Sequence, residues 1–352
     1  MSDRKDIAEI IADYRLHDRE NGLLNIKINK NHVERWIEQF PQNQDIILGE
    51  TKKLLGRYYF SEARVYKKLR KLAQAEKLWN DPEEVMTKAY FLDCQAAGKS
   101  QRQLLDMMEK VVQEMYGIRI KRTDKAIDDR AMYIYLDDGL FSGRTLFYDM
   151  ASLVPHIHTG SKIWSIFLII HSFGEWWVME NIQKSFDMRE IGFNIGHRKK
   201  IFNSDGENYP FDCLRPKQYK SDLVDEYICS LKKEKENNTG KKLFTFRSSA
   251  RPASDRFDSE ENRTILEQEL MEAGLKICSF PRDRMQNMRP MGYDNRITFG
   301  FGAFFATFMN MSNNCPLAYW WGDASAGDWH PFSKWYPLLP RRAHENVEPC
   351  AW

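Results

Sequence analysis

Apolar residues recur at helical spacing along the first eighty residues. Ile7, Ile10, Ile11 and Tyr14 follow the i, i+3, i+4, i+7 pattern of one helix face. The same kind of pattern predicts three further helices, over residues 32–40, 46–59 and 61–79. Asp81-Pro82 then interrupts the pattern, because proline cannot continue a helix interior. We therefore expect residues 1–83 to form a helical N-terminal region.

From residue 84 onward, short apolar runs alternate with helical patterns. Runs typical of strands occupy residues 89–93, 117–120, 133–136, 164–171 and 243–246. Helical patterns lie within 94–117 and over 146–154, 173–188, 221–231 and 259–273, the last ending at Gly274 before one more strand. This alternation predicts an α/β fold with a mostly parallel sheet over residues 84–352.

Composition excludes some classes of protein and leaves others open. The chain has 352 residues, of which 42% are hydrophobic, so it can bury a sizeable core. A net charge of +2 argues neither for nor against a nucleic-acid partner. No apolar run is long enough for a membrane helix, and the charged N-terminus lacks the apolar core of a signal peptide. Six scattered cysteines without a C-x-x-C pair read as reduced thiols, which predicts a cytoplasmic protein.

The stretch 133–145, YIYLDDGLFSGRT, carries the strongest chemical signal. Asp137 and Asp138 directly follow the predicted strand 133–136, and a small-residue loop then leads into a helix. Backbone N–H groups at such a helix N-terminus form a phosphate cradle. Carboxylates repel phosphate, so the acid pair should face sugar hydroxyls, a magnesium ion or both. The alternative is an ordinary buried strand followed by an Asp-Asp-Gly turn.

This stretch resembles the phosphoribosyl pyrophosphate (PRPP) loop of type I phosphoribosyltransferases, with four apolar residues, two acids and a small-residue loop ending in Gly-x-Thr. The resemblance implies a parallel sheet with helices on both faces, and ribose hydroxyls held by Asp137 and Asp138. It implies a 5′-phosphate held by the loop, with Mg²⁺ arriving on PRPP or a nucleotide and no direct protein ligand to the metal. The loop residues are Gly139, Leu140, Phe141, Ser142, Gly143, Arg144 and Thr145. Phe141 departs from the family, which usually has a small residue there.

A second loop, at Gly98, Lys99 and Ser100, also suggests an anion site between a strand and a helix. A Walker A loop of an NTPase needs an earlier glycine, but Asp93 stands at that position, although YIYLDD can pass for a Walker B strand. The resemblance implies instead a pyrophosphate loop, in which Lys99 neutralises charge on the leaving pyrophosphate. We prefer this second interpretation, because one ligand then explains both loops.

Three further features each allow two interpretations. Arg263 and Glu267 lie at i, i+4 spacing and form either a surface ion pair or an acceptor-side contact. Trp320 and Trp321 lie in an aromatic C-terminal hood, about 281–352, that either stacks a base or covers the core. The basic helix at 64–77 is either a solvated face or a surface for nucleic acid.

Several short motifs resemble a narrower branch, the phosphoribosyltransferase-like proteins of bacterial anti-phage and retron-type operons. The motifs are W-I-x-Q-F-P (36–41), Q-x-x-G-K-S (95–100), N-R-x-x-L-E-x-x-L-x-x-x-G (262–274) and N-N-x-P-x-x-x-W-W (313–321). This branch implies a toxic defence effector that transfers or cleaves at ribose C1. It also implies operon partners, such as a reverse transcriptase or a nucleic-acid complex. A non-catalytic PRPP or nucleotide sensor and an NTPase that uses residues 98–100 are the alternatives.

Overall fold

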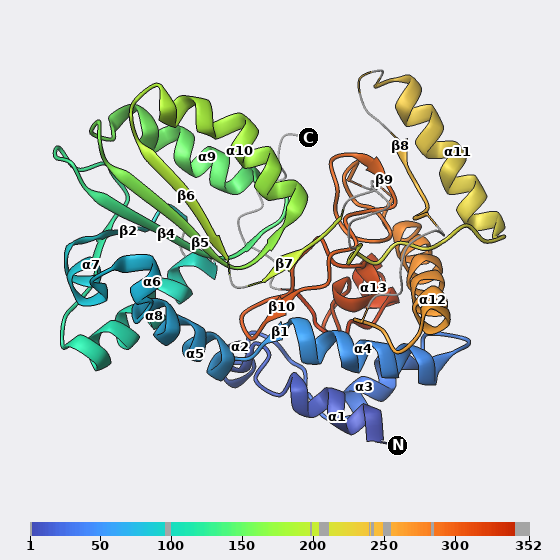
Figure 1. Cartoon of the computed structure of the whole chain (residues 1–352). Helices are drawn as coiled ribbons and strands as arrows, with labels where there is room; N and C mark the ends of the chain where they lie inside the picture. The colour runs from blue at the N-terminus through green and yellow to red at the C-terminus, as the bar shows by residue number, and fades with distance from the viewer. Residues whose placement is uncertain are drawn as a thin grey trace. The chain divides into compact units, whose positions relative to one another are not determined.

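The computed structural model describes residues 2–95, 100–197, 199–203, 211–238, 240, 243–248, 255–282 and 285–341 (Figure 1). The chain divides into two compact units. The first, which we call the two-ended unit, joins Met1–Ser61 to Asp205–Trp352. The second, which we call the sheet unit, is Glu62–Ser204. In the N-terminal part the division between these two units follows Ser61. The domain boundary expected at residue 83 stays a prediction.

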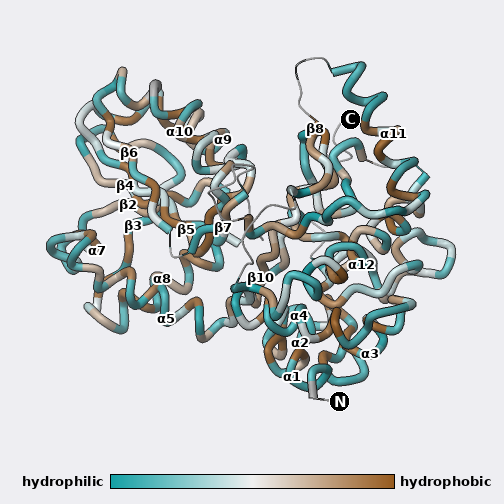
Figure 2. Tube along the Cα trace, turned by 45° about the vertical axis from the view of Figure 1, so that its right-hand side comes forward, coloured by the Kyte–Doolittle hydropathy of each residue, from teal (hydrophilic) through white to brown (hydrophobic). Residues whose placement is uncertain are grey.

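The sheet unit contains a parallel sheet. Its strands are β2 (Tyr90–Leu92), β3 (Lys121–Thr123), β4 (Met132–Leu140), β5 (Lys162–His171), β6 (Gly192–His197) and β7 (Lys200–Ile201). The order is β3-β2-β4-β5-β6, with β7 pairing the end of β5, and every pair is parallel. Figure 2 shows that the central strands are largely hydrophobic (brown), as expected for a sheet covered on both faces. The predicted parallel α/β sheet is confirmed.

Helices cover both faces of this sheet (Figure 1). α9 (Arg144–Leu153) and α10 (Ser172–Asp187) lie on one face, and they share a core with Tyr133, Tyr135, Ile163 and Phe167. α8 (Ser100–Tyr116) lies on the other face and packs on β4 and on α5 (Glu62–Ala73). The unit is completed by α6 (Glu76–Trp79), α7 (Pro82–Lys88) and a 3₁₀ turn, η1 (Val154–His156).

The regular elements of the two-ended unit are mainly helices. Its helices are α1 (Ser2–Ile10), α2 (Leu16–Glu20), α3 (Lys30–Ile37), α4 (Gln44–Tyr58), α11 (Asp222–Glu236), α12 (Glu260–Cys278), α13 (Leu317–Trp320) and η2 (Pro331–Lys334). Two short parallel pairs join β1 (Tyr59–Phe60) to β10 (Ala306–Thr307) and β8 (Leu243–Phe244) to β9 (Ile297–Thr298). Long-range hydrogen bonds hold the two chain ends together: Trp36 Nε1 donates to Ala318 O at 2.9 Å, and Tyr14 Oη donates to Pro340 O at 2.9 Å. Helical periodicity is local, so it gives no sign of this pairing between distant segments.

Two predicted element boundaries were wrong. α12 continues through Gly274 to Cys278, so the strand predicted there does not form. A Cβ on Gly274 would lie 2.4 Å from Pro290 O, so this glycine permits close packing and does not end the helix. The strand predicted at 117–120 lies instead at Lys121–Thr123, and Gly117, with a φ of 71°, follows the end of α8. No helix in the described ranges is long and apolar enough to cross a membrane.

Candidate functional site

The strand order of the sheet unit places a ligand site between β2 and β4. From β2 the chain moves through α8 to β3 on one side, whereas from β4 it moves through β5 to β6 on the other side. The carboxyl ends of β2 and β4 are therefore neighbours at a switch point, where open α/β sheets bind ligands. Asp93, Cys94 and Gln95 follow β2, and Asp137 and Asp138 lie in the last part of β4.

Asp137 is the centre of a buried hydrogen-bond network at this switch point. Its exposed fraction is 6%. Its Oδ1 accepts from Ser100 Oγ at 3.1 Å and from the Asp138 N–H at 2.9 Å, and its Oδ2 accepts from Gln95 Nε2 at 2.8 Å. Donors from the ends of β2 and α8 therefore fix this carboxylate, whose desolvation they partly compensate.

Tyr135 and Asp149 extend this network away from the strand end. Tyr135 Oη donates to Asp149 Oδ2 at 2.8 Å and accepts from Gln95 Nε2 at 2.9 Å. Asp149 lies on α9, so the network joins β2, β4, α8 and α9. Sequence reasoning missed these roles: Tyr135 read as a core strand residue, and Asp149 as one residue of a helix.

The three acids of the site hold protons more tightly than ordinary carboxyl groups. Burial raises the pKa of Asp137. Burial and the neighbouring charge of Asp137 raise the pKa of Asp138 to about 8. Burial also raises the pKa of Asp149. Asp138 is only partly buried, so it is the member of the pair that a ligand can reach most readily. A cation or hydroxyl donors at this carboxyl would favour its charged form.

The loop after β4 is shorter than the sequence suggested. β4 continues through Gly139 to Leu140, which pairs with Ile170, so the acid pair lies inside the strand. The long β5 supplies partners for these extra residues. Only Phe141, Ser142 and Gly143 form the loop, and α9 begins at Arg144, so Arg144 and Thr145 belong to its exposed first turn.

Glycines set the position of this loop. Gly143 adopts a φ of 80°, which is left-handed backbone, and is the N-cap of α9 without a side-chain cap in the described structure. A Cβ on Gly174 of α10 would lie 2.2 Å from Phe141 O, so only glycine fits there. A Cβ on Gly139 would lie 2.6 Å from the Phe141 ring, which therefore packs over this strand position. The arrangement directs the N-terminus of α9, with its partial positive charge, toward the end of β4.

The second predicted loop is described only in part. Ser100 begins α8 and contacts Asp137, so the structure does bring the two predicted loops together at this residue. Gly98 and Lys99 lie outside the described residues. Asp93, at the position of the missing Walker A glycine, accepts from Arg102 Nε at 2.9 Å.

The remaining predicted site residues lie in the two-ended unit and are buried. Arg263 and Glu267 have exposed fractions of 2% and 0%, so the expected surface ion pair was wrong. Glu267 accepts from Arg263 Nε at 2.8 Å, from Arg247 Nε at 2.7 Å and from the Arg215 N–H at 3.2 Å. Trp320 and Trp321 are also buried, and Trp320 Nε1 donates to Cys315 O at 2.8 Å. A contact of these residues with an acceptor stays a prediction.

The chemistry of the acid pair fits a magnesium ion that arrives with a phosphate ligand. Mg²⁺ prefers oxygen ligands and usually keeps several waters, binding one or two carboxylates together with substrate phosphates. Asp137 and Asp138 provide such oxygens beside a helix N-terminus. In the described ranges, no group of three or more His, Cys, Asp or Glu side chains is placed to hold a metal ion by itself.

Comparison with known proteins identifies the family. No curated protein matches the chain. Among solved structures, the AQ2163 protein from Aquifex aeolicus is similar at 15% identity over 32% of this chain and 55% of that chain. Its TM-score of 0.23 is too low to support an argument about fold or function. A family model described as PRTase-CE matches residues 33–341, which is most of the chain. The chain therefore belongs to the PRTase-CE family, the phosphoribosyltransferase-like proteins of conflict systems.

Proposed function

We propose that the sheet unit binds PRPP, or a related ribose 5-phosphate nucleotide, with Mg²⁺ and transfers or cleaves at ribose C1. One observation carries this proposal: two adjacent acids lie beside the N-terminus of α9 at the switch point of a parallel sheet. Membership of the PRTase-CE family supports it. Phosphoribosyltransferases in general typically use magnesium-bound PRPP.

Charge and exposure give each residue of the site a different role in binding the ligand. Asp138, being partly exposed, accepts hydrogen bonds from the ribose hydroxyls. Asp137 holds the strand end in place through the hydrogen bonds that it accepts from Ser100, Gln95 and the Asp138 N–H. The N–H groups from Ser142 to Thr145 bind the 5′-phosphate at the helix N-terminus. Lys99, outside the described residues, is proposed to neutralise charge on the pyrophosphate. Mg²⁺ would screen the pyrophosphate from the acid pair.

The reaction proposed for PRPP is a substitution at C1. The bond from C1 to the pyrophosphate oxygen breaks, and pyrophosphate leaves with the electron pair. A nucleophilic atom of the acceptor, or water, bonds to C1 and loses its proton to solvent or to a carboxylate. Positioning and electrostatic stabilisation supply the catalysis, because no covalent intermediate with the protein is needed.

An assay of pyrophosphate release from PRPP in the presence of Mg²⁺ tests this activity. The purified chain should release pyrophosphate when supplied with pooled nucleobases, nucleosides or water as acceptors. Asp138→Asn should reduce the rate at least about a hundredfold if the acid acts in the transition state. PRPP binding without turnover under any acceptor would instead identify a non-catalytic sensor.

The contact between Ser100 and Asp137 also favours a second function, that of an NTPase. A P-loop places its Ser or Thr beside the acid of a neighbouring strand, and these two residues are 3.1 Å apart. ATP hydrolysis lost in Lys99→Ala, together with unchanged PRPP turnover, would favour this function. The NTPase function would be excluded by two results together: the wild type hydrolyses no ATP, and Asp138→Asn loses PRPP turnover.

We further propose that the protein acts as a toxic effector in anti-phage defence, held in check by partner proteins or nucleic acid. Conflict-system membership supports this role. Expression of the chain alone in a bacterial host should slow growth, and Asp137→Asn combined with Asp138→Asn should restore growth at equal protein level. A double variant that is equally toxic would contradict a role for the acid pair in toxicity.

A further inference from the structure

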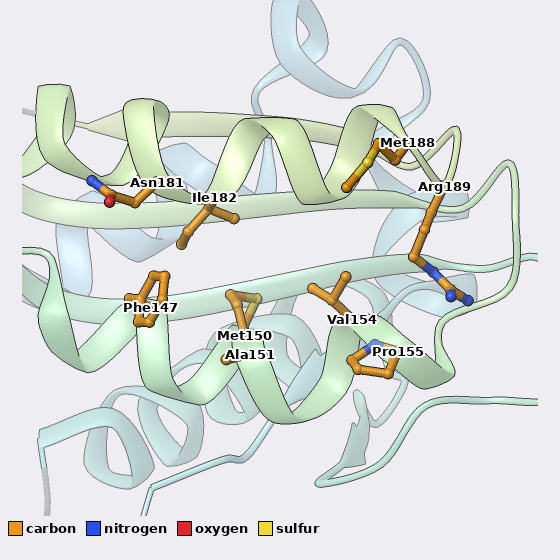
Figure 3. A pocket seen from close by; sticks show the side chains of 9 residues that line it. All are labelled: Phe147, Met150, Ala151, Val154, Pro155, Asn181, Ile182, Met188 and Arg189. Atoms are coloured by element: carbon orange, nitrogen blue, oxygen red, sulfur yellow. The ribbon is translucent and has the colours of Figure 1, made fainter.

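An apolar groove runs between α9 and α10 on the face of the sheet unit (Figure 3). Its volume is about 370 Å³, which is within the range of small-molecule sites. Most of its lining is apolar, and the side chains of both helices point into it (Figure 3). The lining residues are Phe147, Met150, Ala151, Val154, Pro155, Asn181, Ile182, Met188 and Arg189.

The guanidinium of Arg189 lies at one end of this groove. The Arg189 Nη2 donates to Ile157 O at 3.0 Å, which holds the guanidinium beside η1. Its Nε is buried and has no hydrogen-bond partner among the described residues. Asp187, the nearest acid before it in the chain, accepts from Gln183 at 2.7 Å instead. Within the described ranges, no carboxylate forms an ion pair with Arg189. A buried donor without a partner costs free energy, which an anionic ligand would recover.

The length of the groove complements this charge. Phe147 and Val154 line it seven residues apart on the α9 side, so it extends for roughly 10 Å at 1.5 Å per residue. At the end away from Arg189, Asn181 donates its Nδ2 to Trp177 O, so this amide is already used within its own helix. The groove therefore has a cationic group at one end and an uncharged amide at the other.

We infer that this groove binds a small anionic amphiphile, a molecule with an unbranched alkyl chain and a carboxylate or phosphate head. The alkyl chain lies between Phe147, Met150 and Ile182, and burial of its apolar surface provides the main driving force. The anionic head accepts from Arg189, whose planar guanidinium suits such groups. This site is separate from the ribose-phosphate site, and the inference does not depend on the proposed function.

Calorimetric titration of the full chain with octanoate, below the concentration at which it forms micelles, tests this inference. Octanol and octylammonium serve as probes of equal chain length without the negative charge. Octanoate should bind saturably, and octanol and octylammonium at least tenfold more weakly. Arg189→Gln should weaken octanoate binding at least tenfold, with partial recovery in Arg189→Lys.

A variant at the groove wall separates loss of the site from loss of the fold. Ala151 is exposed on α9 and lines the groove, so Ala151→Trp should fill it and abolish octanoate binding. Ser152→Trp, at the next exposed position and outside the groove, should leave octanoate binding unchanged. No octanoate binding, or equal binding of octanoate and octanol, would overturn the inference. The inference would also be overturned if the chain associates with itself and Ala151→Trp abolishes this association, because a second copy would then occupy the groove.

Discussion

Ser100, the first residue of α8, donates a hydrogen bond of 3.1 Å to Asp137 in β4, across the switch point of the sheet. The two residues are 37 positions apart in the chain. This bond links the start of the helix that follows β2 to the acid pair of β4. A change in either loop is therefore expected to affect the other.

Removal of this hydroxyl should weaken ligand binding at the acid pair. Ser100→Ala removes one of the three donors closest to the buried Asp137 carboxylate, so the charged form becomes less favourable. We expect the affinity for PRPP with Mg²⁺ to fall about three- to tenfold, in line with roughly 1 kcal/mol for one typical hydrogen bond. Ser152→Ala is the matched control, because this residue is exposed and its hydroxyl donates to Asp149 O and to no other group that the structure describes. Equal affinities in wild type and Ser100→Ala would contradict a role for this contact.

Asp138 should make both binding and stability depend on pH. Its pKa is raised to about 8, whereas an unfolded aspartate has a pKa of about 4. The folded state therefore binds more protons than the unfolded state between these values, and stability falls as the pH rises through that window. We compare the unfolding free energy of Asp138→Asn with that of the wild type by urea unfolding at two pH values. The difference in favour of the variant should be about 1–2 kcal/mol larger at about pH 9 than at about pH 5.

The same proton should appear in ligand binding. Magnesium-bound PRPP favours the charged carboxyl, so binding near pH 7 should release about one proton. Calorimetry in buffers of different ionisation enthalpy measures this release. Proton release that is as large in Asp138→Asn as in the wild type would assign the titration to another group.

Gly174 should be intolerant of a side chain because of its contact with the loop. Gly174→Ala places a Cβ 2.2 Å from Phe141 O, so the loop or the start of α10 must shift. We expect a loss of about 1–3 kcal/mol in unfolding free energy and weaker PRPP binding. Gly196→Ala in β6 is the control, since its Cβ would meet Ile166 at an ordinary 3.6 Å. Unchanged stability and binding in Gly174→Ala would show that the loop adapts freely.

The sequence was sufficient to predict the parallel sheet and the position of Asp137 and Asp138 after an apolar strand segment. The apolar runs at 133–136 and 164–171 are local signals, and they correspond to β4 and β5, which are central in the sheet. The acid pair and the helix at 146–154 likewise follow from neighbouring residues. The end of β4 could not be predicted in the same way, because Gly139 and Leu140 gain their strand pairing from the distant Ile169 and Ile170.

Long-range packing explains the other differences. Gly274 looks like a helix end in the sequence, and only the approach of Pro290 explains why glycine lies inside α12. The spacing of Arg263 and Glu267 fits an exposed helix face equally well. Their burial depends on Arg215 and Arg247, which come from other segments. The role of Tyr135 depends on Gln95 and Asp149, from the ends of other elements.

The Glu267 network should contribute to stability and not to the ribose-phosphate site. Glu267→Gln removes the carboxylate that the buried Arg247 and Arg263 share, and Arg247 then keeps only its ion pair with Glu260 among the described residues. We expect a loss of about 3–5 kcal/mol in unfolding free energy, as for other broken buried ion pairs. PRPP affinity of the folded protein should stay within about twofold, since this network belongs to the two-ended unit. Glu261→Gln, at an exposed position on the same helix, should change neither quantity.

The most direct test of the central claim is calorimetric titration of the purified chain with PRPP and Mg²⁺, beside ATP and Mg²⁺. We predict saturable PRPP binding that requires Mg²⁺ and disappears when Asp137→Asn and Asp138→Asn are combined in a protein that still folds. Binding of ATP alone, or PRPP binding that survives in the double variant, would contradict a ribose-phosphate site at the end of β4.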